Sequence, residues 1–289
     1  MTVQILGAYG LIGSAMLKKL PWATCPTRAD LDLNDAASIA AADLKGDILV
    51  HAAGVTDEEF AADPASAWIR ATRLTQGLLE AAAKAGIKRL VYVSTAHVYG
   101  PLEGDITEVR PVNPLGDYAL AHFASEQLCR RAALQRGLDV LILRPCAVYG
   151  LLPDLARFKR WSLIPFSFPR ELLQTGKIVL KSDGEQRRNF VSADAIAAEA
   201  AAFLASPLEP GRCRVQNAIG PDDMTVFAFA ARCIALLRPG QGRVERPSPV
   251  LGPTKGPKPA PLAYRSRYTS AEPHSTLDAT IRALAAQIQ

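Results

Sequence analysis

Residues 2–20, with the sequence TVQILGAYGLIGSAMLKKL, decide the fold of this chain. The apolar run 3–6 predicts a buried strand, and residues 15–20 place apolar side chains at helical spacing. Between them stand Gly7, Gly10 and Gly13, in the spacing Gly-x-x-Gly-x-x-Gly. A strand that turns sharply into a helix presents free backbone N–H groups, which bind phosphate. The stretch therefore favours dinucleotide binding over a plain glycine turn.

Strands and helices are predicted to alternate through the first half of the chain. Apolar runs at 22–27, 47–53, 88–95 and 138–144 predict four further strands, and helices are expected at 36–42, 64–85 and 118–135. Asn34 or Asp35 is expected to cap the first of these helices, and Gly86 to end the second. This alternation predicts an α/β fold, a Rossmann-type doubly wound parallel sheet. Residues 1–150 are expected to form a dinucleotide-binding domain.

The pattern loosens after residue 150, and residues 151–289 are expected to be mainly a small α/β substrate-binding region. Short strands are predicted at 177–180, 189–192 and 212–217, and helices at 193–205, 224–237 and 276–288. Residues 187–205 are expected to return to the first domain, with Asp194 capping their helix. Residues 239–261 are rich in proline and glycine and predict a loop.

Composition excludes several classes of function. The 289 residues are 49% apolar with a net charge of +5, and no aromatic–basic motif indicates a nucleic-acid partner. No apolar run reaches the roughly 18 residues of a membrane span, and no secretory signal is expected because the first strand begins at residue 2 or 3. The five cysteines form no C-x-x-C pair. They predict reduced thiols in the cytoplasm, without disulfides or a metal site.

Six motifs occur in a fixed order along the chain. They are GAYGLIG at 7–13, HAAG at 51–54, STAHVYG at 94–100, NPLGDYALAH at 113–122, LRPCAVYG at 143–150 and RRNFVSADA at 187–195. In this order they resemble the extended short-chain dehydrogenase/reductases of the NAD(P)-dependent epimerase/dehydratase type, which act on nucleotide sugars. The resemblance runs from the first strand to about residue 200. It implies a homodimer that pairs through the helices at 64–85 and 118–135.

Thr95 and Tyr118 are the candidate catalytic pair. Thr95 ends a parallel strand, where ligands of open α/β sheets bind, and Tyr118 begins the helix that follows soon after. A tyrosine hydroxyl can exchange a proton with a carbinol or ketone while a nicotinamide exchanges hydride. Its ordinary pKa near ~10 is too high for a base at neutral pH, so a nearby cation must lower it. The resemblance makes Thr95 the hydroxyl partner, Tyr118 the acid/base, and position 122 a lysine.

Position 122 is His122 in this chain, and two interpretations stay open. In one, His122 replaces the lysine, hydrogen-bonds the nicotinamide ribose and carries positive charge for part of the time at pH 7. In the other, the catalytic pair is degraded and Tyr118 is only a ligand contact. The chain would then be a catalytically impaired dinucleotide-binding relative that acts as a sensor or scaffold. Ala71, which aligns with the family's asparagine, is a second departure.

The residues expected to contact the substrate indicate which reaction is not expected. Sugar dehydratases of the family carry an Asp–Glu pair where this chain has Ala96 and His97, so 4,6-dehydration is not expected. His97 is either a partly buried polar side chain near the cofactor or a proton donor to substrate. The resemblance pairs Arg188 with the diphosphate of a nucleotide-linked substrate, and the alternative is a surface Arg187–Arg188 pair.

Two further residues near strand ends are not expected to take part in the chemistry. Tyr149 is expected to pack structurally at the sheet edge. Cys146 is not expected to be a nucleophile, since no histidine partner is visible.

Cofactor choice depends on the end of the strand predicted at 22–27. Arg28 there favours NADP, with NAD as the second choice, because an arginine pairs with the extra phosphate; the alternative is a solvated loop charge. Asp32 and Leu33 resemble the adenine-contacting pair. We therefore expect an NAD(P)H-dependent oxidoreductase or epimerase acting on a keto or hydroxy group of a sugar-like, nucleotide-linked substrate. The expected substrate contacts are Thr95, His97 and Arg188. The expected cofactor contacts are Gly7, Tyr9, Gly10, Leu11, Ile12, Gly13, Arg28, Asp32, Leu33, Ala52, Ala53, Gly54, Tyr118, His122 and Pro145.

Overall fold

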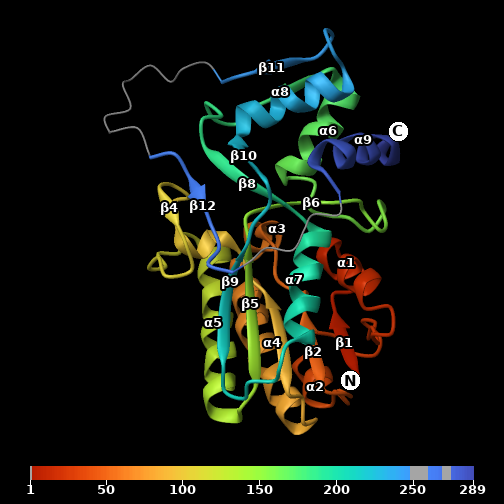
Figure 1. The fold of residues 1–289 in the computed structure, drawn as a ribbon. Coiled ribbons are helices and arrows are strands. Elements are labelled where there is room, and N and C mark those ends of the chain that lie inside the picture. The colour runs from red at the N-terminus through yellow and green to blue at the C-terminus, as the bar shows by residue number, and fades with distance from the viewer. Residues whose placement is uncertain (1, 248–259, 269–274) are drawn as a thin grey trace.

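A five-stranded parallel sheet forms the centre of the molecule (Figure 1). The computed structural model describes residues 2–247, 260–268 and 275–289. The strands lie in the order β1 (Val3–Leu6), β2 (Ile48–His51), β3 (Arg89–Val93), β5 (Asp139–Pro145) and β9 (Cys213–Ala218), and every neighbouring pair is parallel. The first four are almost wholly buried, which explains their continuous apolar runs.

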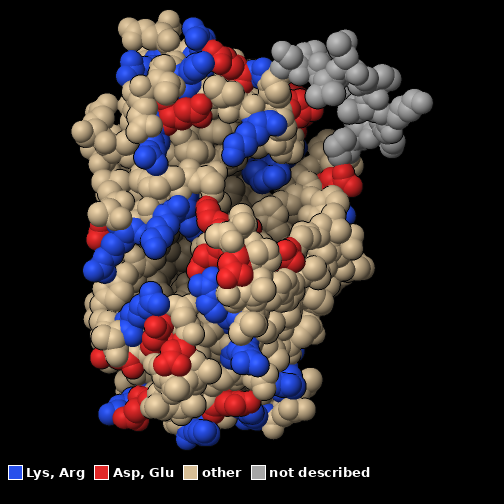
Figure 2. Space-filling model, turned by 180° about the vertical axis from the view of Figure 1, so that it is seen from behind, with Lys and Arg blue, Asp and Glu red and all other residues tan. Residues whose placement is uncertain are grey.

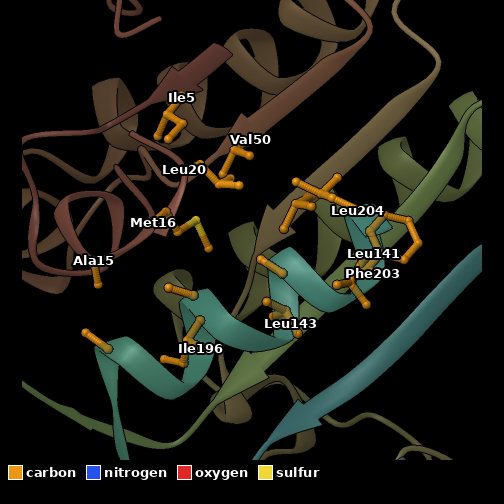
Figure 3. Packing of buried hydrophobic residues seen from close by; sticks show 14 of the residues in the cluster. Ile5, Ala15, Met16, Leu20, Val50, Leu141, Leu143, Ile196, Phe203 and Leu204 are labelled. Carbon is orange, nitrogen blue, oxygen red and sulfur yellow. The ribbon is translucent and has the colours of Figure 1, made fainter. Parts of the chain in front are cut away.

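Helices cover both faces of this sheet. Helices α1 (Leu11–Lys19) and α7 (Ala193–Ala205) pack on one face, where Ile5, Met16 and Phe203 belong to one buried apolar cluster (Figure 3). Helices α2 (Ala36–Ala40), α4 (Pro64–Lys84) and α5 (Asp117–Arg136) cover the other face, over a cluster that contains Leu49 and Leu78. The doubly wound Rossmann-type sheet predicted from the sequence is confirmed.

The strand predicted at 22–27 is wrong. Only Thr24 joins the sheet, by a single parallel bridge to Gln4, with its N–H donating to the Val3 carbonyl at 2.8 Å. Pro21 and Pro26 flank this bridge. Proline has no N–H to donate, so Pro26 cannot supply the next bond of the ladder after Thr24. Before Thr24 the chain turns, and the Ala23 N–H donates to the Leu20 carbonyl at 2.9 Å.

The caps of the helices follow local side-chain chemistry. Asp35 caps α2, as expected, with its carboxylate accepting from the Ala37 N–H. Thr56 and Glu59 form a capping box on α3 (Asp57–Ala62), a short helix that the sequence analysis did not predict. Asp194 is not the cap of α7, contrary to expectation. Ser192 caps that helix, because its hydroxyl accepts from the Ala195 N–H at 3.0 Å.

The C-terminal region has its own small sheets and its own core. Strand β8 (Arg187–Ser192) pairs with β6 (Ala147–Tyr149) and β10 (Asp222–Thr225), β7 (Lys177–Val179) with β11 (Arg243–Glu245), and β4 (Asp105–Ile106) with β12 (Ala263–Tyr264). Helices α6 (Ile164–Thr175), α8 (Val226–Leu237) and α9 (Leu277–Ile288) pack around a cluster that contains Tyr149 and Phe229. Tyr149 is structural, as expected, and its hydroxyl donates to the Ser275 carbonyl at 3.1 Å.

Two expectations about this region change. Residues 151–176, for which no helix or strand was predicted, contain α6, and Met224 lies in β10 rather than in the helix predicted at 224–237. Of the loop predicted at 239–261, residues 248–259 lie outside the described residues. Among the helices that the structure describes, none combines the length and the apolar character that crossing a membrane requires.

Candidate active site

A cavity of about 860 Å³ opens at the carboxyl ends of β1, β2, β3 and β5, against the C-terminal region. This volume lies in the range of small-molecule and cofactor sites. Figure 2 shows one face of the molecule hollowed near its middle, with Lys and Arg side chains beside the hollow. The cavity brings together most of the residues predicted from the sequence, namely Gly7, Tyr9, Gly10, Leu11, Ile12, Ala52, Ala53, Gly54, Thr95, His97, Tyr118, His122, Pro145 and Arg188.

The glycine turn is shaped to receive an anion. Gly7 has a φ of +81°, and a Cβ atom on Gly13 would lie 2.0 Å from the Gly7 carbonyl oxygen. Helix α1 begins after Gly10 without a side-chain cap, so backbone N–H groups of its first turn face the cavity. This donor set and the positive end of the helix dipole fit the diphosphate of a dinucleotide.

Four of the predicted cofactor contacts, Gly13, Arg28, Asp32 and Leu33, are not among the residues that line this cavity. Gly13 packs beneath the turn, against the Gly7 carbonyl. Arg28 is an exposed side chain whose Nε lies 3.2 Å from a carboxylate oxygen of Asp32. Leu33 packs against the apolar cluster on the α2 and α4 face. Arg28 and Asp32 thus form an exposed charged pair on the loop that precedes α2.

Thr95 and Tyr118 approach each other on the cavity wall. Thr95 is buried directly after β3, and its hydroxyl accepts from the His97 N–H at 3.3 Å. Tyr118 is the second residue of α5. Burial raises the pKa of its phenol, while the charge of Arg160 and hydrogen bonding with Arg160 and Thr95 act in the opposite direction. Both residues of the predicted hydroxyl pair therefore line the same cavity.

His122 lies one helical turn beyond Tyr118, and the two ring centroids are 4.6 Å apart. Its Nδ1 is 2.8 Å from the Tyr92 hydroxyl, and its Cε1 lies beside Gly54, where an added Cβ would be 3.5 Å away. Burial, and next the charge of Arg160, lower its pKa to about 3. The partial positive charge expected at position 122 is therefore not present at pH 7, and the imidazole is neutral.

His97 projects into the cavity from the 3₁₀ helix η1 (Ala96–Tyr99), with its ring 6.2 Å from that of Tyr118. The residue is exposed within the cavity. Desolvation by the surrounding walls, followed by the charges of Arg188 and Arg160, lowers its pKa to about 4. His97 therefore presents a neutral imidazole to whatever binds in the cavity.

The two consecutive arginines of β8 have different positions. The Nε of Arg187 lies 2.9 Å from a carboxylate oxygen of Asp223, which fixes it to β10. Arg188 lines the cavity instead. A guanidinium on a cavity wall can make a bidentate contact with a phosphate. Cys146 also lines the cavity, but burial raises the pKa of its thiol, which opposes a nucleophilic role.

Sequence reasoning missed a buried ionic network beneath the site. Glu126 of α5 accepts from the Ser94 hydroxyl at 2.6 Å and from Nε of Arg144 at 2.9 Å, and both charged side chains are almost fully buried. The guanidinium carbon of Arg144 lies 4.7 Å from the ring centroid of Tyr99. Glu126 is one helical turn beyond His122, so spacing along α5 was a usable signal. The network holds the end of β3, and with it Thr95, against α5.

A second missed group is Arg160, from the segment between β6 and α6. Its guanidinium carbon lies 5.7 Å from the ring centroid of Tyr118. It pairs with Asp57 at 3.5 Å and with Glu58 at 3.8 Å. No sequence signal pointed to it, since the segment has no periodicity and lies far from Tyr118 along the chain. Among the residues that the structure describes, no three His, Cys, Asp or Glu side chains gather as metal ligands would.

Curated proteins match part of this chain. An uncharacterised UDP-glucose epimerase of Bacillus subtilis is 35% identical over 117 residues, which cover 40% of this chain and 34% of that protein. The chain spans half or less of the length of the curated relatives that it matches.

Solved structures share the whole fold. MoeE5 in complex with UDP-glucose and NAD superposes with a TM-score of 0.76 at 20% identity, over 100% of both chains. RMD from Pseudomonas aeruginosa complexed with NADPH gives a TM-score of 0.79 at 20% identity, over 99% of this chain and 98% of that one. The family model for the NAD dependent epimerase/dehydratase family matches residues 3–214. The chain therefore belongs to the NAD dependent epimerase/dehydratase family, whose enzymes are of the extended short-chain dehydrogenase/reductase type.

Proposed function

We propose that this protein is an NADP(H)-dependent reductase or epimerase acting on a keto or hydroxy group of a sugar-like, nucleotide-linked substrate. One observation carries the proposal. Thr95 and Tyr118 lie on the wall of the same cavity as the glycine turn and Arg188. One cavity thus contains an acid/base group, a turn that can bind a dinucleotide and a cation that can bind phosphate.

The binding roles follow from the charges around the cavity. The N–H groups at the start of α1 would hold the dinucleotide diphosphate, and Ala52, Ala53 and Gly54 give its adenosine half room to pass. Arg28 would pair with the extra phosphate of NADP by exchanging its contact with Asp32. Arg188 would pair with the substrate diphosphate. A neighbour of this fold binds UDP-glucose with NAD, and another binds NADPH, which supports both ligand classes.

The chemistry of the chain's own residues is proton transfer. When bound, the nicotinamide supplies or accepts the hydride. Tyr118 gives its hydroxyl proton to the substrate oxygen during reduction and takes it back during oxidation. Thr95 donates a hydrogen bond that orients the same oxygen. Ala96 and His97 offer no carboxylate pair for water loss, so dehydration is not part of the proposal.

The proposed assembly is a homodimer in the cytoplasm that pairs through α4 and α5. Leu120 and Leu134 of α5 are exposed and lie two heptads apart, and Ile69 of α4 is exposed as well. All five cysteines are free, as a reducing compartment requires. Light scattering after size exclusion tests the dimer. Leu120→Lys combined with Leu134→Lys should give monomers, and an unchanged mass would contradict this interface.

Calorimetric binding of NADPH and NADH, followed by a turnover screen with keto-sugar nucleotides, tests the function. We expect NADPH to bind more tightly, Tyr118→Phe to lower turnover by about 10²–10⁴-fold with binding retained, and Arg28→Ala to weaken NADPH but not NADH. Binding without turnover of any substrate would favour the sensor or scaffold alternative. Absence of binding to either dinucleotide would contradict both.

A further inference from the structure

Tyr118 needs a cation, and position 122 does not supply it. A phenol loses its proton readily near neutral pH only where a positive charge stabilises the phenolate that remains. His122 is buried and neutral, with one ring nitrogen engaged by the Tyr92 hydroxyl. The charge must therefore come from another element packed against the phenol.

The groups that face Tyr118 come from four other parts of the chain besides its own helix. His97 of η1 and His122 of α5 flank its ring, at centroid distances of 6.2 and 4.6 Å. The carboxylate of Asp57, at the start of α3, acts on the phenol as a negative charge, and Arg188 of β8 acts on the neighbouring His97. Arg160 is the cation whose charge acts on Tyr118 directly, with its guanidinium carbon 5.7 Å from the ring centroid.

Arg160 is held in this position by the first turn of α3. Asp57 and Glu58 form ion pairs with its guanidinium at 3.5 and 3.8 Å, and the Ser162 hydroxyl of the same segment donates a hydrogen bond to Glu58. The Arg160 side chain is 30% exposed, so its charge is only partly screened by water. These contacts fix the segment that carries Arg160 to the loop that follows β2.

We propose that Arg160 supplies the positive charge that stabilises the phenolate of Tyr118, in the place of a lysine at position 122. The inference rests on the proposed function and adds a residue to the same site. Arg160 acts through Tyr118, as a positioning residue. When the Tyr118 Oη–H bond breaks and the proton passes to the substrate oxygen, the electron pair stays on Oη, and the guanidinium over the ring offsets the negative charge of the phenolate. Arginine keeps its charge at every physiological pH, so this support does not titrate away.

The first test needs neither cofactor nor substrate. Tyrosines are replaced by 3-fluorotyrosine, whose more acidic phenol titrates while the protein is folded, and the ¹⁹F resonance lost in Tyr118→Phe identifies the site. The titration of Tyr118 is then followed in the wild type, Arg160→Met and Arg160→Lys. Arg157→Met is the matched control, since Arg157 lies in the same segment with its own ion pair to Asp154 at 3.5 Å.

We expect Arg160→Met to move the Tyr118 midpoint to higher pH, Arg160→Lys to restore part of the shift, and Arg157→Met to leave it in place. Far-ultraviolet circular dichroism of each variant shows whether the protein is folded. A Tyr118 midpoint that is equal in the wild type and in folded Arg160→Met would overturn the proposal.

A second test uses turnover of a keto-sugar nucleotide with NADPH. Arg160→Met should lower kcat by about 10–100-fold at neutral pH, and the basic limb of the pH profile should move in the same direction as the ¹⁹F titration. A rise in KM with kcat and the pH profile unchanged would make Arg160 a substrate ligand and overturn the proposal. If the wild type turns over no substrate, the proposed function fails, while the ¹⁹F titration still decides the role of Arg160.

Discussion

The Nδ1 atom of His122 lies 2.8 Å from the hydroxyl oxygen of Tyr92. The contact fixes the plane of the imidazole and uses one of its two nitrogens. Burial keeps the ring neutral, with a pKa of about 3. His122 is thus a rigid neutral hydrogen-bonding group at the position where the family resemblance implies a flexible cation.

The first prediction concerns acid stability. The folded protein protonates His122 less readily than the unfolded chain, whose histidines have an ordinary pKa near ~6.5. The contribution of neutral His122 to folding stability is therefore fully present above about pH 6.5 and is lost as the pH decreases toward about 3. His122→Asn should flatten this loss, and His51→Asn should do so independently, because burial lowers the pKa of His51 to about 4. Urea unfolding at neutral and acidic pH measures the slope. Equal slopes in wild type and both variants would contradict the assignment.

The second prediction distinguishes two roles of the glycine turn, the close packing at Gly13 and the binding of a dinucleotide at Gly10. A Cβ atom on Gly13 would lie 2.0 Å from the Gly7 carbonyl oxygen, whereas one on Gly10 would lie 3.3 Å from it. Gly13→Ala should therefore cost about 1–3 kcal/mol of unfolding free energy, because helix α1 must move away from β1. Gly10→Ala should leave stability nearly unchanged and weaken dinucleotide binding by about tenfold or more, because its methyl group would occupy space beside the diphosphate.

Thermal unfolding and calorimetric titration of NADPH distinguish the two variants. If Gly10→Ala bound NADPH as the wild type does, the diphosphate would not lie against this turn.

The third prediction concerns the ion pair at the far end of the sheet. Arg89 and Asp139 begin β3 and β5, are almost fully buried, and approach within 3.3 Å. Arg89 also donates to the carbonyls of Leu204, in the last turn of α7, and of Ser206, which follows that helix. Removing one partner leaves the other charge buried, so Asp139→Asn should cost about 3–5 kcal/mol.

Chemical denaturation measures this cost, with Asp43→Asn as the control, because Asp43 forms an exposed pair with Lys45. A loss no larger than that of the control would show that the buried pair contributes little.

The sequence predicted the parts of the fold that local chemistry decides. The continuous apolar runs and the glycine turn led to the sheet and to α1, because burial on both faces and close packing leave a direct mark on residue type. The strand predicted at 22–27 failed because Pro26 removes the next ladder donor after Thr24 and the chain turns before it. Asp194 is the expected cap and Ser192 the observed one, since both residue types cap helices and only the backbone at the start of α7 decides between them.

Electrostatic state was harder to predict than position. Thr95, Tyr118 and His122 reach the cavity as their motifs imply. The neutrality of His122 depends on its burial and on Arg160, which reaches the site from a segment without periodicity or motif. Arg160 and Asp57 meet only through the tertiary fold, so no spacing along the chain relates them.

The last prediction concerns Glu199, a buried carboxyl on α7 whose oxygens have no hydrogen-bond partner among the described residues. Burial raises its pKa to about 8, although Arg214 and Gln216 act in the opposite direction. The folded protein holds this proton more tightly than the unfolded chain does. The contribution to stability is therefore complete below about pH 4.5 and is lost as the pH rises through about 8.

Glu199→Gln keeps the shape of the side chain and removes the ionisation. It should stabilise the protein by roughly 1–3 kcal/mol at alkaline pH and change little at acidic pH. Urea unfolding across this range tests the effect, with Glu185→Gln as the control, because Glu185 forms an exposed pair with Arg246. A gain that is the same at acidic and alkaline pH would mean that folding does not raise the pKa of Glu199. A loss at alkaline pH would mean that the carboxylate is ionised in the folded protein, held by Arg214 on the neighbouring strand β9.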